Sequence, residues 1–278
     1  MTTGIGPSAN CVDDIRTPNA EIPDHRVPNG LASIRHLAFN TPPGSVRKPT
    51  IYCMKHPMDP EDYSAVPLFP LPNVVLFPGA VLPLHIFEER YKVMMVDALR
   101  GPRLLAMALL RPGWEKNYHG RPSIEPVVCV GSIISQEKLP DGRYNFLLRG
   151  QQRCRVVREH GDEPYRVGWL EAIAESDAME IDFADDRRRL ESVFQSPVLG
   201  LSSLGRKFQQ LLAGPTSTIQ IADLVAFYFL EDLQLKQSLL AEPDPRTRVT
   251  RVVQNFESLH SIVQGTFPVG ISGNPSMN

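Results

Sequence analysis

The fold is decided by residues 66–91, which read VPLFPLPNVVLFPGAVLPLHIFEERY. Two apolar runs in this stretch, Val66–Leu71 and Val81–Phe87, predict short strands. The pairs Pro72-Asn73 and Pro78-Gly79 between them are typical of turns. Because proline lacks a backbone N–H donor, the prolines inside both runs restrict these strands to edges, ends or bulges of a sheet.

The residues that follow predict one helix and then four more strands. Glu88–Leu99 has apolar residues at helical spacing and acidic residues in its first turn, where the helix dipole favours negative charge. A turn at Pro140-Asp141-Gly142 predicts a hairpin. Six strands with one inserted helix favour a small curled sheet or barrel over a doubly wound fold. The four later strands are expected at Arg103–Leu110, Val127–Leu139, Arg143–Val157 and Tyr165–Ala174.

The sequence after Glu175 predicts a bundle of helices, which makes the fold class α+β. The last helix has the clearest start, because Asp244 can cap it and Pro245 suits its first position. An apolar stripe runs along it from Val249 to Val263. The other helices are expected at Phe183–Gln195, Leu204–Ala213, Ile219–Leu230 and Gln234–Ala241.

Residues 1–64 differ in composition from the rest of the chain. Nine of the 26 prolines fall before residue 61, and the apolar residues show no sustained period. Such a stretch buries too little surface to offset its ordering entropy, so we predict a disordered extension. Met54 and Met58 stand just before the first regular segment, so each is an alternative to Met1 as the translation start.

Composition and motifs exclude several classes of function. The net charge of −2 argues against a constitutive nucleic-acid binder, which normally has a strongly basic face. No run approaches the ~18 apolar residues of a membrane helix, and the N-terminus shows no basic region followed by an apolar one, so we expect no signal peptide and a cytoplasmic protein. The cysteines form no CxxC pair, and Cys53 with His56 supplies too few ligands for zinc, so neither a metal nor a cofactor is predicted.

Catalytic motifs are missing from the sequence as well. It contains no G-x-x-x-x-G-K-[ST] phosphate loop, no G-x-S-x-G elbow and no H-E-x-x-H helix. No local context marks a Ser-Lys dyad, and His85 lies in an apolar strand, where a structural histidine is the usual role. We therefore predict that the protein is not an enzyme.

Two sequence features point to a binding surface instead. The polar loop from Arg111 to His119 carries Trp114 and Tyr118, and aromatic residues on loops are common interaction anchors. The alternative is that Trp114 folds back onto the sheet. Strand alternation also places four arginines on one face of a strand: Arg143, Arg149, Arg153 and Arg155. This face is either a basic stripe that binds acidic or backbone-carbonyl partners or simply a solvated strand face.

Residues 66–171 resemble the Lon N-terminal domain family. The resemblance rests first on residues 69–79 and 82–91, an ordered proline-rich pattern that ends in Phe87-Glu88-Glu89-Arg90-Tyr91. Further matches are Gly131, Leu139-Pro140-Asp141-Gly142 and Leu148-Arg149-Gly150, with Arg153 and Arg155 after them.

The resemblance implies a PUA-like pseudobarrel followed by a helical bundle. The expected boundaries are a disordered extension (1–64), the barrel (65–176), the bundle (177–267) and a disordered tail (268–278). The sequence contains neither the ATPase nor the peptidase module of full-length Lon enzymes, so the resemblance implies binding rather than hydrolysis. Within the matching signature, Glu88 and Arg90 are expected to hold the helix start against the sheet and Tyr91 to insert beneath it. For the signature as a whole, fold maintenance and ligand contact both remain open.

The implied ligands are unfolded or exposed hydrophobic polypeptide segments. The implied partners in protein quality control are an ATP-dependent protease or a chaperone. RNA binding by a PUA-like barrel and membership of a protease assembly are the alternatives. The candidate peptide-binding residues are Phe87, Glu88, Arg90, Tyr91, Arg111, Trp114, Tyr118 and Arg149.

Overall fold

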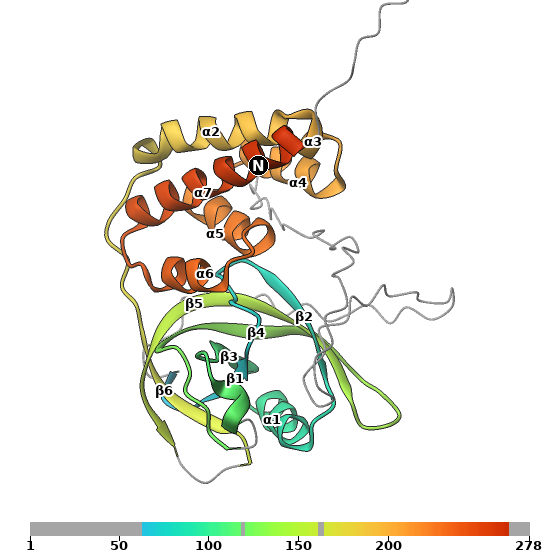
Figure 1. The fold of residues 1–278 in the computed structure, drawn as a ribbon. Coiled ribbons are helices and arrows are strands. Elements are labelled where there is room, and N and C mark those ends of the chain that lie inside the picture. The colour runs from blue at the N-terminus through green and yellow to red at the C-terminus, as the bar shows by residue number, and fades with distance from the viewer. Residues whose placement is uncertain (1–62, 118–119, 161–163, 267–278) are drawn as a thin grey trace, which may run out of the picture.

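The computed structural model of the chain describes residues 63–117, 120–160 and 164–266. Within these ranges the chain forms a mixed α+β fold with a six-stranded sheet and seven α-helices. Figure 1 shows the helices that follow the last strand gathered above the strands, with the helix nearest the N-terminus beside the strands on the far side from them. The strands are β1 (Val66–Leu71), β2 (Val81–Ile86), β3 (Leu104–Leu109), β4 (Val127–Lys138), β5 (Tyr144–His160) and β6 (Arg166–Ala172).

The strand order is β2-β5-β4-β3-β1-β6, and β6 pairs with β5 as well as with β1. Strand pairing therefore runs in a closed circuit through β5, β4, β3, β1 and β6, while β2 lies outside the circuit. The β1–β3 pair is parallel and the other pairs are antiparallel.

The strand prolines lie where a missing N–H donor does no harm. Pro67 pairs only with β6 and Pro70 only with β3, so each occupies a part of β1 that has a single neighbouring strand. Pro83 lies in β2, which pairs with β5 alone. β2 is thus an edge strand as predicted, whereas β1 lies between β3 and β6 and has its prolines where only one of these strands is paired.

The helices follow the predicted segments closely. They are α1 (Glu89–Arg100), α2 (Ala184–Gln195), α3 (Pro197–Gly200), α4 (Ser203–Ala213), α5 (Thr218–Phe229), α6 (Leu233–Ala241) and α7 (Pro245–Thr266), with 3-10 turns at Trp114–Asn117 and Glu180–Phe183. The side chains of Ser202, Ser217 and Asp232 accept hydrogen bonds from the first-turn amides of α4, α5 and α6. In the part of the chain that the structure describes, no helix has the length and apolar character needed to cross a bilayer.

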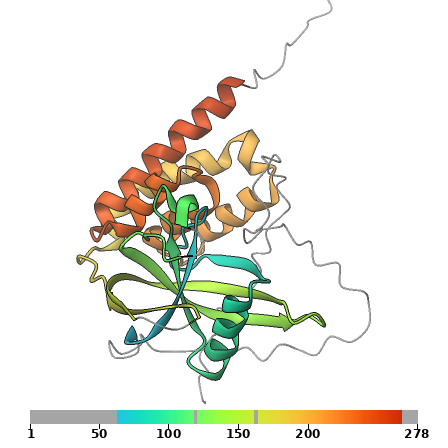
Figure 2. The same ribbon diagram turned by 60° about the horizontal axis from the view of Figure 1, so that its bottom comes forward.

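Two apolar clusters hold the fold together. One lies inside the strand circuit and takes buried residues from β1, β3, β4, β5 and β6, among them Leu68, Ala106 and Val130. The other covers the opposite strand faces, includes α1 and continues without a break into the bundle. Figure 2 shows the bundle on one side of the strands and α1 on the other. Because one core spans both parts, the strands and the bundle are packed as a unit.

An aromatic group forms the centre of the bundle. Phe194 of α2 has its ring centroid 4.9 Å from that of Phe208 and 5.1 Å from that of Phe256. Phe229 lies 5.5 Å from Phe194 in an edge-on arrangement. These four rings join α2, α4, α5 and α7, and offset or edge-on pairs of this kind add to the stabilisation from burial.

A buried ionic cluster joins the strands to the bundle. Arg153 of β5 donates a hydrogen bond of 2.5 Å from Nη2 to Oδ1 of Asp223 on α5, and Nε of Arg248 on α7 lies 3.3 Å from the same oxygen. Glu175 Oε1 accepts from Arg153 at 3.2 Å and from Arg248 at 2.7 Å. Burial lowers the pKa of Arg153, but Asp223 and Glu175 raise it by more. Burial also raises the pKa of Asp223, against the opposing charges of both arginines.

The position of Arg153 corrects the predicted arginine stripe. Arg143, Arg149 and Arg155 are exposed, whereas the side chain of Arg153 is only 3% exposed. A bulge in the β4–β5 pairing between Val130 and Gly131 adds a residue to β5 and interrupts the alternation of its faces. In addition, α5 and α7 cover this part of β5, so the guanidinium meets Asp223 rather than solvent.

Candidate functional site

The candidate site begins where α1 follows β2. Arg90 Nε donates to Glu88 Oε2 at 3.0 Å, and the Arg90 guanidinium lies 4.6 Å from the centroid of the Tyr91 ring. Tyr91 is buried and packs on Phe69 of β1, with 4.6 Å between ring centroids. Tyr91 thus inserts beneath the helix start as expected, whereas the hydrogen bond between Glu88 and Arg90 joins them to each other rather than to the sheet.

Tyr91 is a neutral phenol in this position. Burial raises the pKa of Tyr91 to about 12, although the charges of Arg90 and Arg166 oppose the shift. The hydroxyl therefore keeps its proton at neutral pH and can donate a hydrogen bond.

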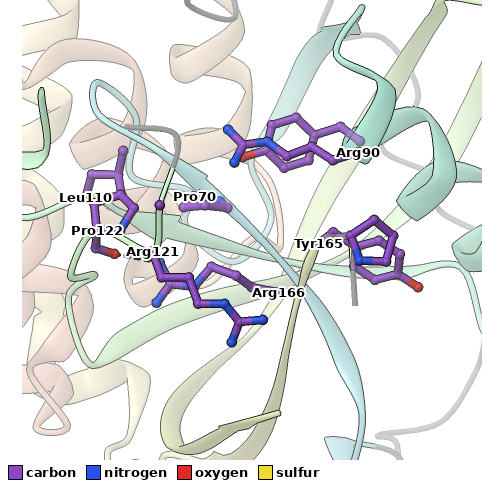
Figure 3. Close-up of a pocket in the computed structure, with 10 residues that line it drawn as sticks. Pro70, Arg90, Leu110, Arg121, Pro122, Tyr165 and Arg166 are labelled. Carbon is purple, nitrogen blue, oxygen red and sulfur yellow. Dashed lines mark hydrogen bonds between the residues drawn. The ribbon is translucent and has the colours of Figure 1, made fainter. Parts of the chain in front are cut away.

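Arg90 and Tyr91 form one wall of an open cleft of about 390 Å³. Figure 3 shows Arg90 on one side of Pro70, with Arg121 and Arg166 on the other side. A cleft of this size lies within the range of ligand sites, which run from ~300 to 1,000 Å³. The lining residues are Pro70, Arg90, Tyr91, Leu110, Gly120, Arg121, Pro122, Pro164, Tyr165 and Arg166.

Strand pairing brings the second wall to the first. Because β1 and β6 are antiparallel with Leu68 opposite Arg166, the start of β6 lies beside Pro70. Arg166 donates from Nε and Nη2 to the two carboxylate oxygens of Glu159, at 2.7 and 2.5 Å. Its Nη1 donates to the Pro122 carbonyl at 2.6 Å, which ties the loop before β4 to the same wall.

The remaining polar groups are held by contacts at the rim. Arg121 Nη1 donates to the His160 carbonyl oxygen at 3.3 Å. The Tyr165 hydroxyl donates to Asp97 Oδ2 at 3.0 Å, which links the start of β6 to α1. The lining side chains therefore come from β1, α1, the loop before β4 and the start of β6.

The sequence-predicted site residues do not all meet in this cleft. Arg90 and Tyr91 line it, and Glu88 supports Arg90. Phe87 is half-buried, 6.3 Å from the His85 ring between centroids. Arg149 is exposed on β5, opposite Val81, and is not a lining residue.

The aromatic loop is partly folded back onto the sheet. Trp114 packs against the cluster inside the strand circuit, as the alternative interpretation of this loop expects. Arg111 lies with its Nε 3.5 Å from Glu125 Oε1. Tyr118 lies outside the described residues.

Sequence reasoning missed Arg121, Tyr165 and Arg166. Their approach to Arg90 depends on the pairing of β1 with β6, which no local pattern reveals. The one available signal was the basic and proline-rich end of the loop at Gly120-Arg121-Pro122.

The chemistry of the lining residues suits binding. Three guanidiniums, two phenols and three proline rings face the cleft, and none of the described lining residues is a serine, cysteine, lysine, histidine, aspartate or glutamate. Within the ranges that the structure describes, no three His, Cys, Asp or Glu side chains are grouped so that they could hold a metal.

The fold and the cleft together define an α+β domain with an open cleft lined by arginine, tyrosine and proline side chains. Residues 65–255 match the family described as the ATP-dependent protease La (LON) substrate-binding domain. This match covers more than half of the 278 residues, and the chain belongs to this family.

Lon proteases have similar sequences over most of this chain. The Lon protease of Dictyoglomus thermophilum is 27% identical over 191 residues, which cover 67% of this chain and 23% of that protein. Lon protease 2 of Myxococcus xanthus is 24% identical over 243 residues, or 87% of this chain and 28% of that protein. The chain thus spans about a quarter of the length of these relatives.

Two solved structures share the fold. The Lon N-terminal domain protein from Xanthomonas campestris has a TM-score of 0.52 and 24% identity, and the match covers 69% of this chain and 98% of that one. The N-terminal domain of the Mycobacterium avium complex Lon protease has a TM-score of 0.55 and 16% identity, and the match covers 70% of this chain and 98% of that one.

Proposed function

We propose that this protein is a non-catalytic recognition module that binds unfolded or exposed hydrophobic segments of polypeptides. One observation carries the proposal: a chain of the Lon substrate-binding family has an open cleft where Arg90, Tyr91, Tyr165 and three prolines meet. Aromatic and proline rings offer rigid apolar contact area, and arginine and tyrosine are the residues that most often anchor protein interfaces.

In the cell, we propose a role as an adaptor or chaperone-like partner in protein quality control. The protein would hold a client segment and present it to an ATP-dependent protease or a chaperone. Its proposed location is the cytoplasm, where such clients and proteases meet. Phe87, Glu88, Arg111, Trp114, Tyr118 and Arg149 remain proposed contributors to the binding surface, beyond the cleft itself.

We also propose that the strand circuit is a PUA-like pseudobarrel, with boundaries at residues 65–176 for the barrel and 177–267 for the helical bundle. The support is the double pairing of β6, with β1 on one edge and β5 on the other. The apolar cluster inside the circuit takes residues from all five of its strands, as the interior of a barrel would.

Binding of a permanently unfolded polypeptide tests the proposed function. We expect the full chain to bind a reduced and iodoacetamide-alkylated protein, and not the native form of the same protein. Tyr165→Ala should weaken this binding about fivefold, because truncating an interface tyrosine commonly costs more than about 1 kcal/mol. Fluorescence anisotropy measures both affinities.

Trp169→Ala is the matched control, since Trp169 lies on β6 but outside the cleft, stacked under Arg158 at 4.0 Å. Equal binding of folded and unfolded protein would contradict the proposal. So would peptide fragments on a gel after incubation with or without ATP. If RNA bound more tightly than the unfolded protein, and its affinity fell steeply with salt concentration, the nucleic-acid alternative would be favoured.

A further inference from the structure

The cleft has a cationic character that hydrophobic client binding alone does not require. We infer that it binds a carboxylate group of the client polypeptide, either a C-terminal α-carboxylate or an aspartate or glutamate side chain. This inference rests on the proposed function, since it names the chemical group by which the same cleft would select its polypeptide.

The first argument is the charge of the lining. Arg90, Arg121 and Arg166 reach the cleft from three separate segments (Figure 3), and none of the described residues that line it is acidic. Two carboxylates contact these guanidiniums, Glu88 at Arg90 and Glu159 at Arg166. Among the residues that the structure describes, the guanidiniums at the cleft thus outnumber the carboxylates that contact them, and a bound carboxylate would supply a further partner.

The second argument is that two of the arginines are held in place before any ligand arrives. Arg166 has three hydrogen bonds, two to Glu159 and one to the Pro122 carbonyl, and its side chain is only 11% exposed. Arg90 is fixed by Glu88 and by the Tyr91 ring. A cationic site that is already ordered loses less side-chain entropy on binding than flexible surface arginines do.

Arg121 is the residue most suited to direct contact. It is exposed at the rim, and among the residues that the structure describes its one hydrogen-bond partner is a neutral carbonyl, that of His160. A planar guanidinium matches both oxygens of a carboxylate through two parallel N–H···O bonds. The ligand would therefore bring to Arg121 the negative charge that Glu88 and Glu159 give the other two arginines.

The apolar walls indicate what lies next to the carboxylate. Pro70, Leu110, Pro122 and Pro164 line the cleft with the two tyrosines. A volume of about 390 Å³ is near the lower end of ligand sites, so it accommodates a short segment rather than a long extended strand. The expected ligand is thus a carboxylate beside one or two apolar residues.

Three forms of one N-acetylated decapeptide of alanine, leucine, tyrosine and glycine test the inference by calorimetry with the full chain. One form has a free C-terminal carboxylate, the second is amidated and neutral, and the third is amidated with a single internal glutamate. We expect at least one carboxylate form to bind about tenfold more tightly than the neutral form, the effect of one charge-assisted hydrogen bond. The form that gains affinity identifies the source of the carboxylate.

Arg121→Ala should remove most of that tenfold preference, so that the carboxylate form and the neutral form bind with nearly equal affinity. Arg188→Ala is the control, because Arg188 is an exposed arginine on α2, paired with Asp185 and remote from the cleft in sequence and structure. Equal affinity for all three forms would overturn the inference, as would stronger binding of a single-stranded oligonucleotide that displaces the peptides. If the alkylated unfolded protein still binds although the three peptides bind equally, the proposed function stands and only the carboxylate preference is wrong. If neither the unfolded protein nor any of the peptides binds, the proposed function and the carboxylate preference are both wrong.

Discussion

Replacing Asp223 with alanine is expected to lower the free energy of unfolding by about 3–5 kcal/mol. Asp223 is 3% exposed and contacts both Arg153 and Arg248, which are themselves buried. Without this carboxylate, Glu175 alone faces two guanidiniums that cannot lose their protons. The cost is that of an uncompensated buried charge at the junction of strands and bundle, and urea unfolding followed by circular dichroism measures it.

Asp185→Ala supplies the control for Asp223→Ala. Asp185 also pairs with an arginine, but its side chain is 76% exposed, so the loss should stay below about 1 kcal/mol. A further variant replaces the charges together, as Arg153→Met, Asp223→Leu and Arg248→Met. If uncompensated charge is the cause, this triple variant should be more stable than Asp223→Ala. A triple variant less stable than Asp223→Ala would show that the ion pairs themselves stabilise the junction.

Local sequence patterns were sufficient to predict most of the secondary structure. The strand at Val66–Leu71 has the predicted bounds, and the helix predicted at Ile219–Leu230 forms at Thr218–Phe229. Strand alternation, helical spacing, turn pairs and caps all act over a few residues, so one sequence contains them. The four-residue helix α3 was missed, because Pro197–Gly200 is too short to show a period.

The candidate site was only partly predictable, because it depends on contacts between distant segments. Arg90 and Tyr91 were found through their own helix start. Arg121 and Arg166 reach them through the β1–β6 pairing, and the partner of Arg153 lies 70 residues away on α5. A single bulge in β5 was enough to make the predicted arginine stripe wrong, since alternation gives the face of a strand residue only while the pairing stays regular.

Gly150 shows how a local motif such as Leu148-Arg149-Gly150 can have a purely three-dimensional cause. The Gly150 amide donates to the Ala80 carbonyl at 2.9 Å, and the Gly79 amide donates to the Gly150 carbonyl at 2.9 Å. A Cβ atom on Gly150 would lie 2.1 Å from the Phe77 carbonyl oxygen and 3.2 Å from Cys129 Sγ. Only a residue without a side chain lets β5 approach the connection between β1 and β2 this closely.

Gly150→Ala is therefore expected to lower the free energy of unfolding by about 3–4 kcal/mol, from overpacking and from the strain or loss of the two backbone hydrogen bonds. The clashing atom belongs to the backbone, so no side-chain rotation relieves it. Gly142→Ala is the control: Gly142 has a φ of 83° and a Cβ atom there would meet nothing within 4 Å, so only a conformational cost of about 1–2 kcal/mol is expected. Urea unfolding measures the free energy of unfolding of both variants. If Gly150→Ala lowered it no more than Gly142→Ala does, β5 would be able to move away from Phe77 at little cost.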